Sequence, residues 1–358
     1  MGLIDQLGRT ALFMLSPERA HNVSIQGLKS GIVPAARVTK DQRLNVELAG
    51  LTFPNPVGLA AGYDKNAEVP DAILSLGFGF TEVGTITPKG QPGNPKPRIF
   101  RLVEDHGVIN RLGFNNEGHD AAIARLKARA HKPGIVGVNI GANKTSEDFV
   151  ADYEKGIAVF FPLASYFTVN ISSPNTPGLR NLQAGEALQV LIDRIFEQVA
   201  IAEEKHGRKV PVFLKIAPDL ETGEMDEIAG IVSASKLSAL IVSNTTLARD
   251  GLKNRIYANE AGGLSGQPLF ESSTRVVAQM RKRLDQKIPI IGVGGIGNAQ
   301  QAITKICAGA SLVQLYTGMV YEGPCLPSQI VKGMSKYLDE TGVASVSELV
   351  GTKTEEWL

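Results

Sequence analysis

The sequence predicts an α/β protein, a (β/α)8 TIM barrel preceded by a small helical hairpin. Eight short apolar runs recur along the chain, and helical patterns lie between most of them. Strands that are apolar along their whole length are buried on both faces, so the runs indicate a parallel sheet covered by helices. Eight strand–helix units, with no Gly-x-Gly-x-x-Gly motif after the first, favour a closed barrel over an open doubly wound sheet. The runs are 57–61, 80–86, 135–140, 167–171, 212–216, 239–242, 290–293 and 312–316.

The composition is that of an ordinary globular protein, with 43% hydrophobic and 20% charged residues in a chain of 358. A net charge of +1 argues against a broad nucleic-acid-binding surface, so no nucleic-acid partner is expected. Two cysteines, Cys307 and Cys325, form no disulfide framework, which favours a reducing compartment. The five histidines lack metal-ligand spacing, and we predict no metal.

Residues 1–43 are predicted to form an amphipathic helical hairpin and a linker. Apolar residues recur at helical spacing over 2–15, and Ser16-Pro17-Glu18 is typical of an N-cap and first turn of a second helix. The hairpin is too short for a core of its own, so its apolar face either packs on the main body or meets lipid or an apolar ligand. No apolar run is long enough to span a bilayer and the start lacks the pattern of a signal peptide, so we expect a protein that is neither secreted nor integral to a membrane, with surface association left open.

Residues 44–358 are predicted to form the barrel domain. A short alternating hairpin over 44–53 precedes the first run, and apolar spacing predicts helices around 184–199 and 228–232. Three connections after strands are longer than turns, and the first of them includes a helix at about 118–130. Long connections in a compact barrel are usually lids or binding loops. These connections are 87–133, 172–185 and 244–270.

The stretch 169–180 follows the fourth run and changes from apolar residues to hydroxyls, amides and prolines. Pro174 and Pro177 fix φ, which would hold Ser173 and Asn175 in one geometry, as a preorganised site requires. The same residues also make ordinary turns. Barrel active sites lie at the C-terminal ends of the strands, so the position of the stretch favours a site.

Every predicted strand ends near a glycine or a polar residue that would face this site. Glycines after the seventh and eighth runs offer backbone donors where barrels bind phosphate. Lys65 and Lys215 lie in apolar surroundings, and each should face an anion or an electron-rich ring. The amides carry both donors and acceptors, which suits a flat heterocycle. The residues alone therefore predict a phosphorylated, planar cofactor or substrate, with Ser173 or a lysine as the reactive group.

Ordered motifs run along nearly the whole chain. They are Gly58-Leu-Ala-Ala-Gly-Tyr-Asp-Lys65, Glu82-Val-Gly-Thr-Ile-Thr-Pro88, Gln91-Pro-Gly-Asn-Pro-Lys-Pro-Arg98, Asn110-Arg-Leu-Gly-Phe-Asn-Asn116, Ser243-Asn-Thr-Thr246, Gly262-Gly-Leu-Ser-Gly266 and Gly292-Val-Gly-Gly295. With the opening stretch, they resemble the dihydroorotate dehydrogenases, specifically the membrane-associated, quinone-dependent class (class 2).

The resemblance implies oxidation of dihydroorotate to orotate in de novo pyrimidine (UMP) biosynthesis, with FMN as hydride acceptor and quinone as final electron acceptor. Ser173 would take a proton from C5 of the substrate while the hydride leaves C6. Soluble classes carry Cys at this position, so Ser173 and the hairpin both indicate quinone. The hairpin would form an apolar funnel to the flavin, with His21 and Arg101 near its inner end.

The same resemblance assigns the binding residues. FMN would be held by Ala61, Gly62, Lys65, Thr85, Asn139, Asn170, Lys215, Ser243, Gly266, Gly295, Tyr316 and Thr317, with its phosphate on Gly266, Gly295, Tyr316 and Thr317. Dihydroorotate would contact Lys65, Asn110, Arg111, Leu112, Gly113, Phe114, Asn170, Asn175, Asn244 and Thr245. The resemblance also implies a peripheral membrane protein that needs no protein partner. It would lie on the cytoplasmic face of a bacterial inner membrane, or at the mitochondrial inner membrane in a eukaryote.

Two rival hypotheses stay open on the residues. The first is a phosphate-binding barrel lyase or aldolase that uses Lys215 as a Schiff base, and a colourless protein would favour it. The second is a non-catalytic ligand-binding barrel docked on membranes, which predicts ligand binding without turnover.

Overall fold

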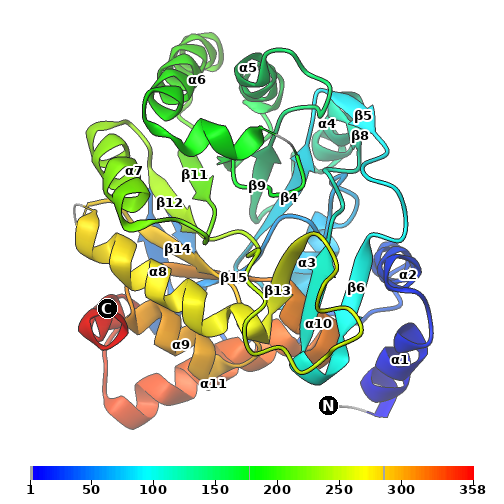
Figure 1. Cartoon of the computed structure of the whole chain (residues 1–358). Helices are drawn as coiled ribbons and strands as arrows, with labels where there is room; N and C mark the ends of the chain where they lie inside the picture. Colours follow the sequence, from blue (N-terminus) through cyan, green and yellow to red (C-terminus); the bar gives the residue numbers. More distant parts are fainter. Residues whose placement is uncertain (1–2, 177, 285–286) are drawn as a thin grey trace.

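The computed structural model describes residues 3–176, 178–284 and 287–358, and within these ranges eight parallel strands close into a barrel (Figure 1). Strand β15 pairs with β3 to complete the ring. The predicted TIM barrel is confirmed, because each of the eight predicted runs coincides with a barrel strand. The strands are β3 (Val57–Leu59), β4 (Phe80–Ile86), β9 (Ile135–Ile140), β10 (Tyr166–Asn170), β11 (Val212–Ile216), β12 (Ala239–Val242), β14 (Ile290–Val293) and β15 (Leu312–Leu315).

Helices surround the barrel and connect its strands (Figure 1). Asn298 caps α9 (Ala299–Cys307), since its side chain accepts the N–H of Gln301. The α-helices outside the N-terminal hairpin are α3 (Pro70–Ser75), α4 (His119–Arg129), α5 (Phe149–Phe160), α6 (Gly185–His206), α7 (Thr222–Ala234), α8 (Phe270–Arg283), α9 (Ala299–Cys307), α10 (Thr317–Glu322) and α11 (Leu326–Thr341). Single 3-10 turns are η1 (Gln42–Leu44), η2 (Val103–Asp105), η3 (Leu179–Gln183), η4 (Gln267–Leu269), η5 (Val346–Leu349) and η6 (Thr354–Trp357).

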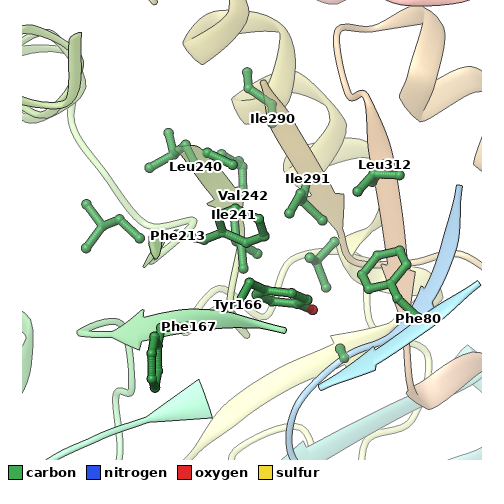
Figure 2. Close-up of a cluster of buried hydrophobic side chains, with 14 of the residues drawn as sticks. Phe80, Tyr166, Phe167, Phe213, Leu240, Ile241, Val242, Ile290, Ile291 and Leu312 are labelled. Carbon is green, nitrogen blue, oxygen red and sulfur yellow. The ribbon is translucent and has the colours of Figure 1, made fainter. Parts of the chain in front are cut away.

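Large aromatic side chains fill the barrel interior below the strand ends. Tyr166 stacks on Phe213 with 4.6 Å between ring centroids, and its ring lies edge-on to Phe80 at 6.4 Å. Figure 2 shows Tyr166 and its neighbour Phe167 pointing to opposite sides of β10, as the period of a strand requires. At the N-terminal end of the barrel, Phe80 contacts Phe53 of the β1 (Val46–Leu48) and β2 (Leu51–Phe53) hairpin at 5.0 Å. This predicted hairpin therefore covers that end.

The N-terminal hairpin is present as predicted and lies beside β6 (Ile99–Leu102), with helices α1 (Leu3–Phe13) and α2 (Pro17–Lys29) (Figure 1). Ser16 holds the N-cap position of α2, but its side chain makes no capping hydrogen bond. An ion pair of 2.7 Å between Glu18 and Arg98 instead ties the start of α2 to the body. Among the helices of the described ranges, none combines the length and the hydropathy that a bilayer span requires.

The long connections contain strands that the sequence analysis did not predict. Strands β6, β7 (Gly107–Asn110) and β13 (Gly263–Gly266) form an antiparallel sheet that joins the first long connection to the third. Strand β5 (Lys89–Gln91) pairs with β8 (Asn116–Gly118). These strands are only three or four residues long, and although β6 and β7 form a local hairpin, β13 and β5 pair with strands distant in sequence, so no periodic pattern marks them. Two of the three connections thus contain strands, and the second, 172–185, contains the 3-10 turn η3.

Substitution of Gly137 by alanine should test the packing of the barrel interior. A Cβ at Gly137 would lie 2.2 Å from the ring of Tyr166, so we expect Gly137→Ala to lower the free energy of unfolding by about 1–3 kcal/mol. Gly230, in α7, has no heavy atom within 4 Å of a built Cβ. Gly230→Ala should therefore be neutral or stabilise by up to about 1 kcal/mol. Urea unfolding measures the free energy of unfolding of both variants. An equal loss in Gly137→Ala and Gly230→Ala would contradict this account of the packing.

Candidate active site

One cavity of about 810 Å³ extends from the C-terminal ends of the barrel strands to the helical hairpin. It is lined by every predicted site residue except Asn139 and Arg111. Its charged lining residues are basic: Lys65 and Lys215 at the strand ends, and Arg9 and Arg101 toward the hairpin. Among the described residues, no aspartate or glutamate lines it. The cavity is therefore suited to anionic groups.

Asn139 lies behind the cavity wall and is completely buried. Its amide accepts a hydrogen bond from Thr85 Oγ1 (2.6 Å) and donates one to Glu82 (3.0 Å). Asn170 donates to Thr85 Oγ1 (2.9 Å) and to Asn139 (3.2 Å). These bonds fix the direction in which the NH2 and the oxygen of each amide point. Asn139 thus acts through Thr85 and Asn170, which do line the cavity.

Glu82 was not predicted to be a site residue. Its carboxylate is fully buried inside the barrel and accepts hydrogen bonds from Gln314 (2.6 Å), Asn139 (3.0 Å) and Tyr166 (3.4 Å). The sequence signal for it is an acidic residue inside an apolar run, 80–86. Such a residue is buried, and a buried charge requires hydrogen-bond partners.

Lys215 is 4% exposed, and burial lowers the pKa of its ammonium, an effect that the negative charge of Glu82 partly opposes. Within the described ranges, its Nζ has neither a hydrogen-bond partner nor an ion-pair partner, although it reaches the cavity. A buried ammonium without a partner is costly, so this position fits an electron-rich group in the cavity.

Ser173 lies in the cavity wall and is 5% exposed. Its Oγ accepts the backbone N–H of Asn175 (3.2 Å), and the Asn175 side chain donates to the carbonyl of Asn110 (3.3 Å). Ser172, on the other side, donates to Asn170 (2.8 Å). The loop is thus fixed on both sides of Ser173. Pro177, which was expected to add rigidity, is outside the described residues.

Lys65 lies between the strand-end part of the cavity and the hairpin. Its Nζ is 3.3 Å from Nε2 of His21. Burial lowers the pKa of Lys65 to about 8, against the opposing charges of Glu18 and Asp64. The carboxylate of the preceding residue, Asp64, accepts the backbone N–H groups of Glu68 (2.7 Å) and Val69 (2.8 Å), so it stabilises its own turn.

His21 and Arg101 reach the hairpin end of the same cavity. Nδ1 of His21 lies 3.2 Å from the hydroxyl of Tyr316. Burial and the nearby charge of Lys65 keep the pKa of His21 well below its usual range, so the imidazole is neutral at pH 7. Arg101 donates to the carbonyls of Leu12 (3.3 Å) and Phe13 (3.2 Å). It therefore holds the end of α1 to the barrel body.

Tyr63 is a further residue at this end that the sequence analysis left unassigned. It lines the cavity, its hydroxyl lies 3.0 Å from Ser24 Oγ of α2, and its ring is edge-on to Tyr316 at 5.4 Å. Its place in an apolar Gly-rich motif gave no signal of this contact.

Glycines form the wall near β13 and β14. Gly266 and Gly295 have positive φ angles of 92° and 74°, and a Cβ at either would lie 2.3 Å from a backbone atom, of His106 or Phe270 respectively. Only glycine fits at these two positions, which leaves backbone groups beside the cavity. Thr317 lies in the same wall, with its hydroxyl 2.8 Å from Ser265 Oγ. This wall fits a phosphate.

The side chain of Arg111 points elsewhere. Its guanidinium pairs with Glu260 at 2.6 Å and donates to the carbonyls of Ala261 (3.1 Å) and Pro97 (3.0 Å). Arg111 lines a second, more open cavity of about 710 Å³, which Pro174 and Asn175 also line.

The described residues contain no group of three or more His, Cys, Asp or Glu side chains placed to hold a metal ion.

The chain is similar to known proteins along nearly its whole length. A family model described as dihydroorotate dehydrogenase matches residues 43–338. The chain is 61% identical to "Dihydroorotate dehydrogenase (quinone)" of Allorhizobium ampelinum, covering 98% of this chain and 97% of that protein. It is 60% identical to the protein of the same description from Rhizobium rhizogenes, over 100% and 98% of the two chains.

Solved structures are similar as well. The structure of DHODH from Eimeria tenella in complex with ferulenol has a TM-score of 0.90 at 40% identity, covering 94% of this chain and 96% of that one. The ligand-free structure from the same organism gives 0.90 at 39%, covering 94% and 99%. The chain therefore belongs to the dihydroorotate dehydrogenase family, in the quinone-dependent class of its curated relatives.

Proposed function

We propose that the protein oxidises dihydroorotate to orotate in pyrimidine biosynthesis and passes the electrons, through FMN, to a membrane quinone. The observation that carries this proposal is the single cavity that joins Ser173 at the strand ends to the helical hairpin. A barrel lyase would need only the strand-end half, and the continuous path to an apolar hairpin favours a second, apolar substrate.

The residues of the cavity fit FMN. The unpartnered ammonium of Lys215 suits an electron-rich ring, and the glycine wall suits a phosphate. The phosphate would rest on Gly266, Gly295, Tyr316 and Thr317. The ring system would be held by Ala61, Gly62, Lys65, Thr85, Asn170, Lys215 and Ser243, with Asn139 fixing two of these from behind the wall. When bound, FMN supplies a hydride acceptor.

Dihydroorotate is an anion whose ring alternates N–H donors and carbonyl acceptors, and it would be bound by Lys65 and by amides. The other contacts would come from Asn110, Leu112, Gly113, Phe114, Asn170, Asn175, Asn244 and Thr245, all of which line the cavity. Arg111 would support this segment indirectly through its ion pair with Glu260.

Ser173 would act as the base that takes the proton from C5 of the substrate, and its own hydroxyl proton would pass to solvent as that proton arrives. Because the N–H of Asn175 already donates to Ser173 Oγ, negative charge that develops on this oxygen is stabilised. A serine hydroxyl is a weak base in water, so the nearly complete burial of Ser173 is also required.

The hairpin would admit the quinone and bind the membrane surface, with residues 1–43 acting as one appended unit. Met14 and Ile32 are 84% and 81% exposed. Exposed apolar residues at the cavity's hairpin end suit peripheral association. We propose the cytoplasmic face of a bacterial inner membrane, or the mitochondrial inner membrane in a eukaryote.

Anaerobic mixing of the purified protein with dihydroorotate should bleach the visible absorption of its flavin. Ser173→Ala should retain FMN but bleach about 10²–10⁴-fold more slowly, because it lacks the base. A protein without flavin bands would overturn the proposed function. Full-rate bleaching in Ser173→Ala would overturn only the assignment of the base.

The affinity for dihydroorotate should fall as the pH rises through about 8. Lys65 has its pKa lowered to about 8, so its ammonium is present below that pH and is lost above it. Since kcat/KM reports the free enzyme, its profile for dihydroorotate should decline there. Lys65→Met should remove this step and lower kcat/KM, whereas exposed Lys144→Met should keep it. A step that persists in Lys65→Met would refute the assignment.

Deletion of residues 1–30 should spare the bleaching by dihydroorotate but strongly slow reoxidation by quinone, because the hairpin half of the cavity is removed. Retained bleaching also shows that the barrel is folded. Unchanged quinone kinetics after the deletion would exclude the proposed quinone path.

Binding to lipid vesicles should fall in the double variant Met14→Ser/Ile32→Ser. It should not fall in Val159→Ser/Val190→Ser, which changes exposed apolar residues of α5 and α6.

A further inference from the structure

Lys305 of α9 is a completely buried lysine that the proposed mechanism does not use. Its Nζ donates to Ser273 Oγ (2.7 Å) and to Thr274 Oγ1 (3.0 Å), both near the start of α8. The ammonium also lies 5.2 Å from the ring centroid of Phe270. Within the described ranges, no carboxylate is within ion-pair distance of it.

Stability alone does not account for a lysine at this position. The hydroxyl of Thr274 donates to the carbonyl of Phe270 (2.6 Å), and Ser273 donates to the same carbonyl (3.2 Å), so both oxygens accept from the lysine. Two neutral hydroxyls take two of the three ammonium protons, and the third has only the face of the Phe270 ring. The first turn of α8 also carries the positive end of the helix dipole, which disfavours a cation. Burial accordingly lowers the pKa of Lys305 to about 7.

The lysine lies directly behind the glycine wall of the cavity. Ser273, which accepts from Lys305, also contacts the carbonyl of Gly294 through its Oγ (3.3 Å). A Cβ at Gly292 would lie 2.8 Å from the Lys305 side chain, and one at Gly294 would lie 2.8 Å from Ser273 Oγ. Gly294 itself lines the cavity. One serine and a glycine backbone therefore separate the amine from the cavity.

We infer that Lys305 is a positioning residue for the phosphate of the cofactor, acting as a buried counter-charge behind the glycine wall. This inference rests on the proposed binding of FMN. A phosphate on Gly295 and Thr317 would place its negative charge on the cavity side of the wall, opposite the ammonium. The medium between them is protein interior, where charges interact more strongly than in water. The anion would compensate the charge that the hydroxyls leave unsatisfied.

Lys305→Met tests this inference, since methionine keeps most of the volume and removes the charge. The dissociation constant of FMN is measured from the flavin fluorescence released when the holoenzyme is diluted. The constant of riboflavin, which lacks the phosphate, is measured in the same way after riboflavin has replaced FMN in the protein. We expect the variant to bind FMN about tenfold more weakly, a typical effect for a buried counter-charge at short range, and riboflavin as tightly as the wild type. Exposed Lys282→Met in α8 should change neither constant.

Equal weakening of both flavins would show a purely structural lysine and overturn the inference, as would unchanged FMN binding. If Lys305→Met does not fold, Lys305→Gln retains hydrogen-bond donors without the charge and must show the same difference between the two flavins. Failure of the proposed function itself is distinguishable, because the wild-type protein would then carry no FMN at all.

Discussion

The carboxylate of Glu82 inside the barrel is the interaction on which the site depends. It has no access to solvent, and three strands supply its hydrogen bonds through Asn139, Tyr166 and Gln314. By fixing Asn139 it determines how the amides above are oriented, and it gives buried Lys215 a nearby negative charge. A buried charge of this kind is tolerated only when fully hydrogen-bonded, so a change at any partner is expected to reach the cavity wall.

The barrel interior is consequently divided into layers. Phe53 and Phe80 close the N-terminal end, and the stacked rings of Tyr166 and Phe213 fill the middle. The hydroxyl of Tyr166 joins the apolar layer to Glu82, above which the interior becomes polar and then opens into the cavity. Rigid packing below thus holds the polar groups above it in place, which is what a preorganised site needs.

The barrel was predictable because buried parallel strands leave a continuous apolar signal, and the position of Ser173 followed from the strand that precedes it. Glu82 was not assigned because its hydrogen-bond partners lie on other strands, and the sequence does not show which side chains of those strands point toward it. The pairing of β7 with β13 joins segments far apart in the chain, and the direction of Arg111 depends on Glu260 across that distance. Neither leaves a local pattern. The family resemblance supplied the binding residues, which spacing alone left open.

The distribution of charge explains why one cavity can take both an anion and an apolar molecule. Acids near the cavity are turned away from it: Asp64 binds backbone N–H groups, and Glu82 lies beneath the wall. Lys65 and Lys215 face the strand-end half, where a carboxylate and a flavin would need positive charge. At the hairpin end, His21 is neutral because burial and Lys65 disfavour its protonation. Beside burial, the same lysine that would bind the anionic substrate therefore also disfavours a charge on the neighbouring imidazole, and the cations of the hairpin end are those of Arg9 and Arg101.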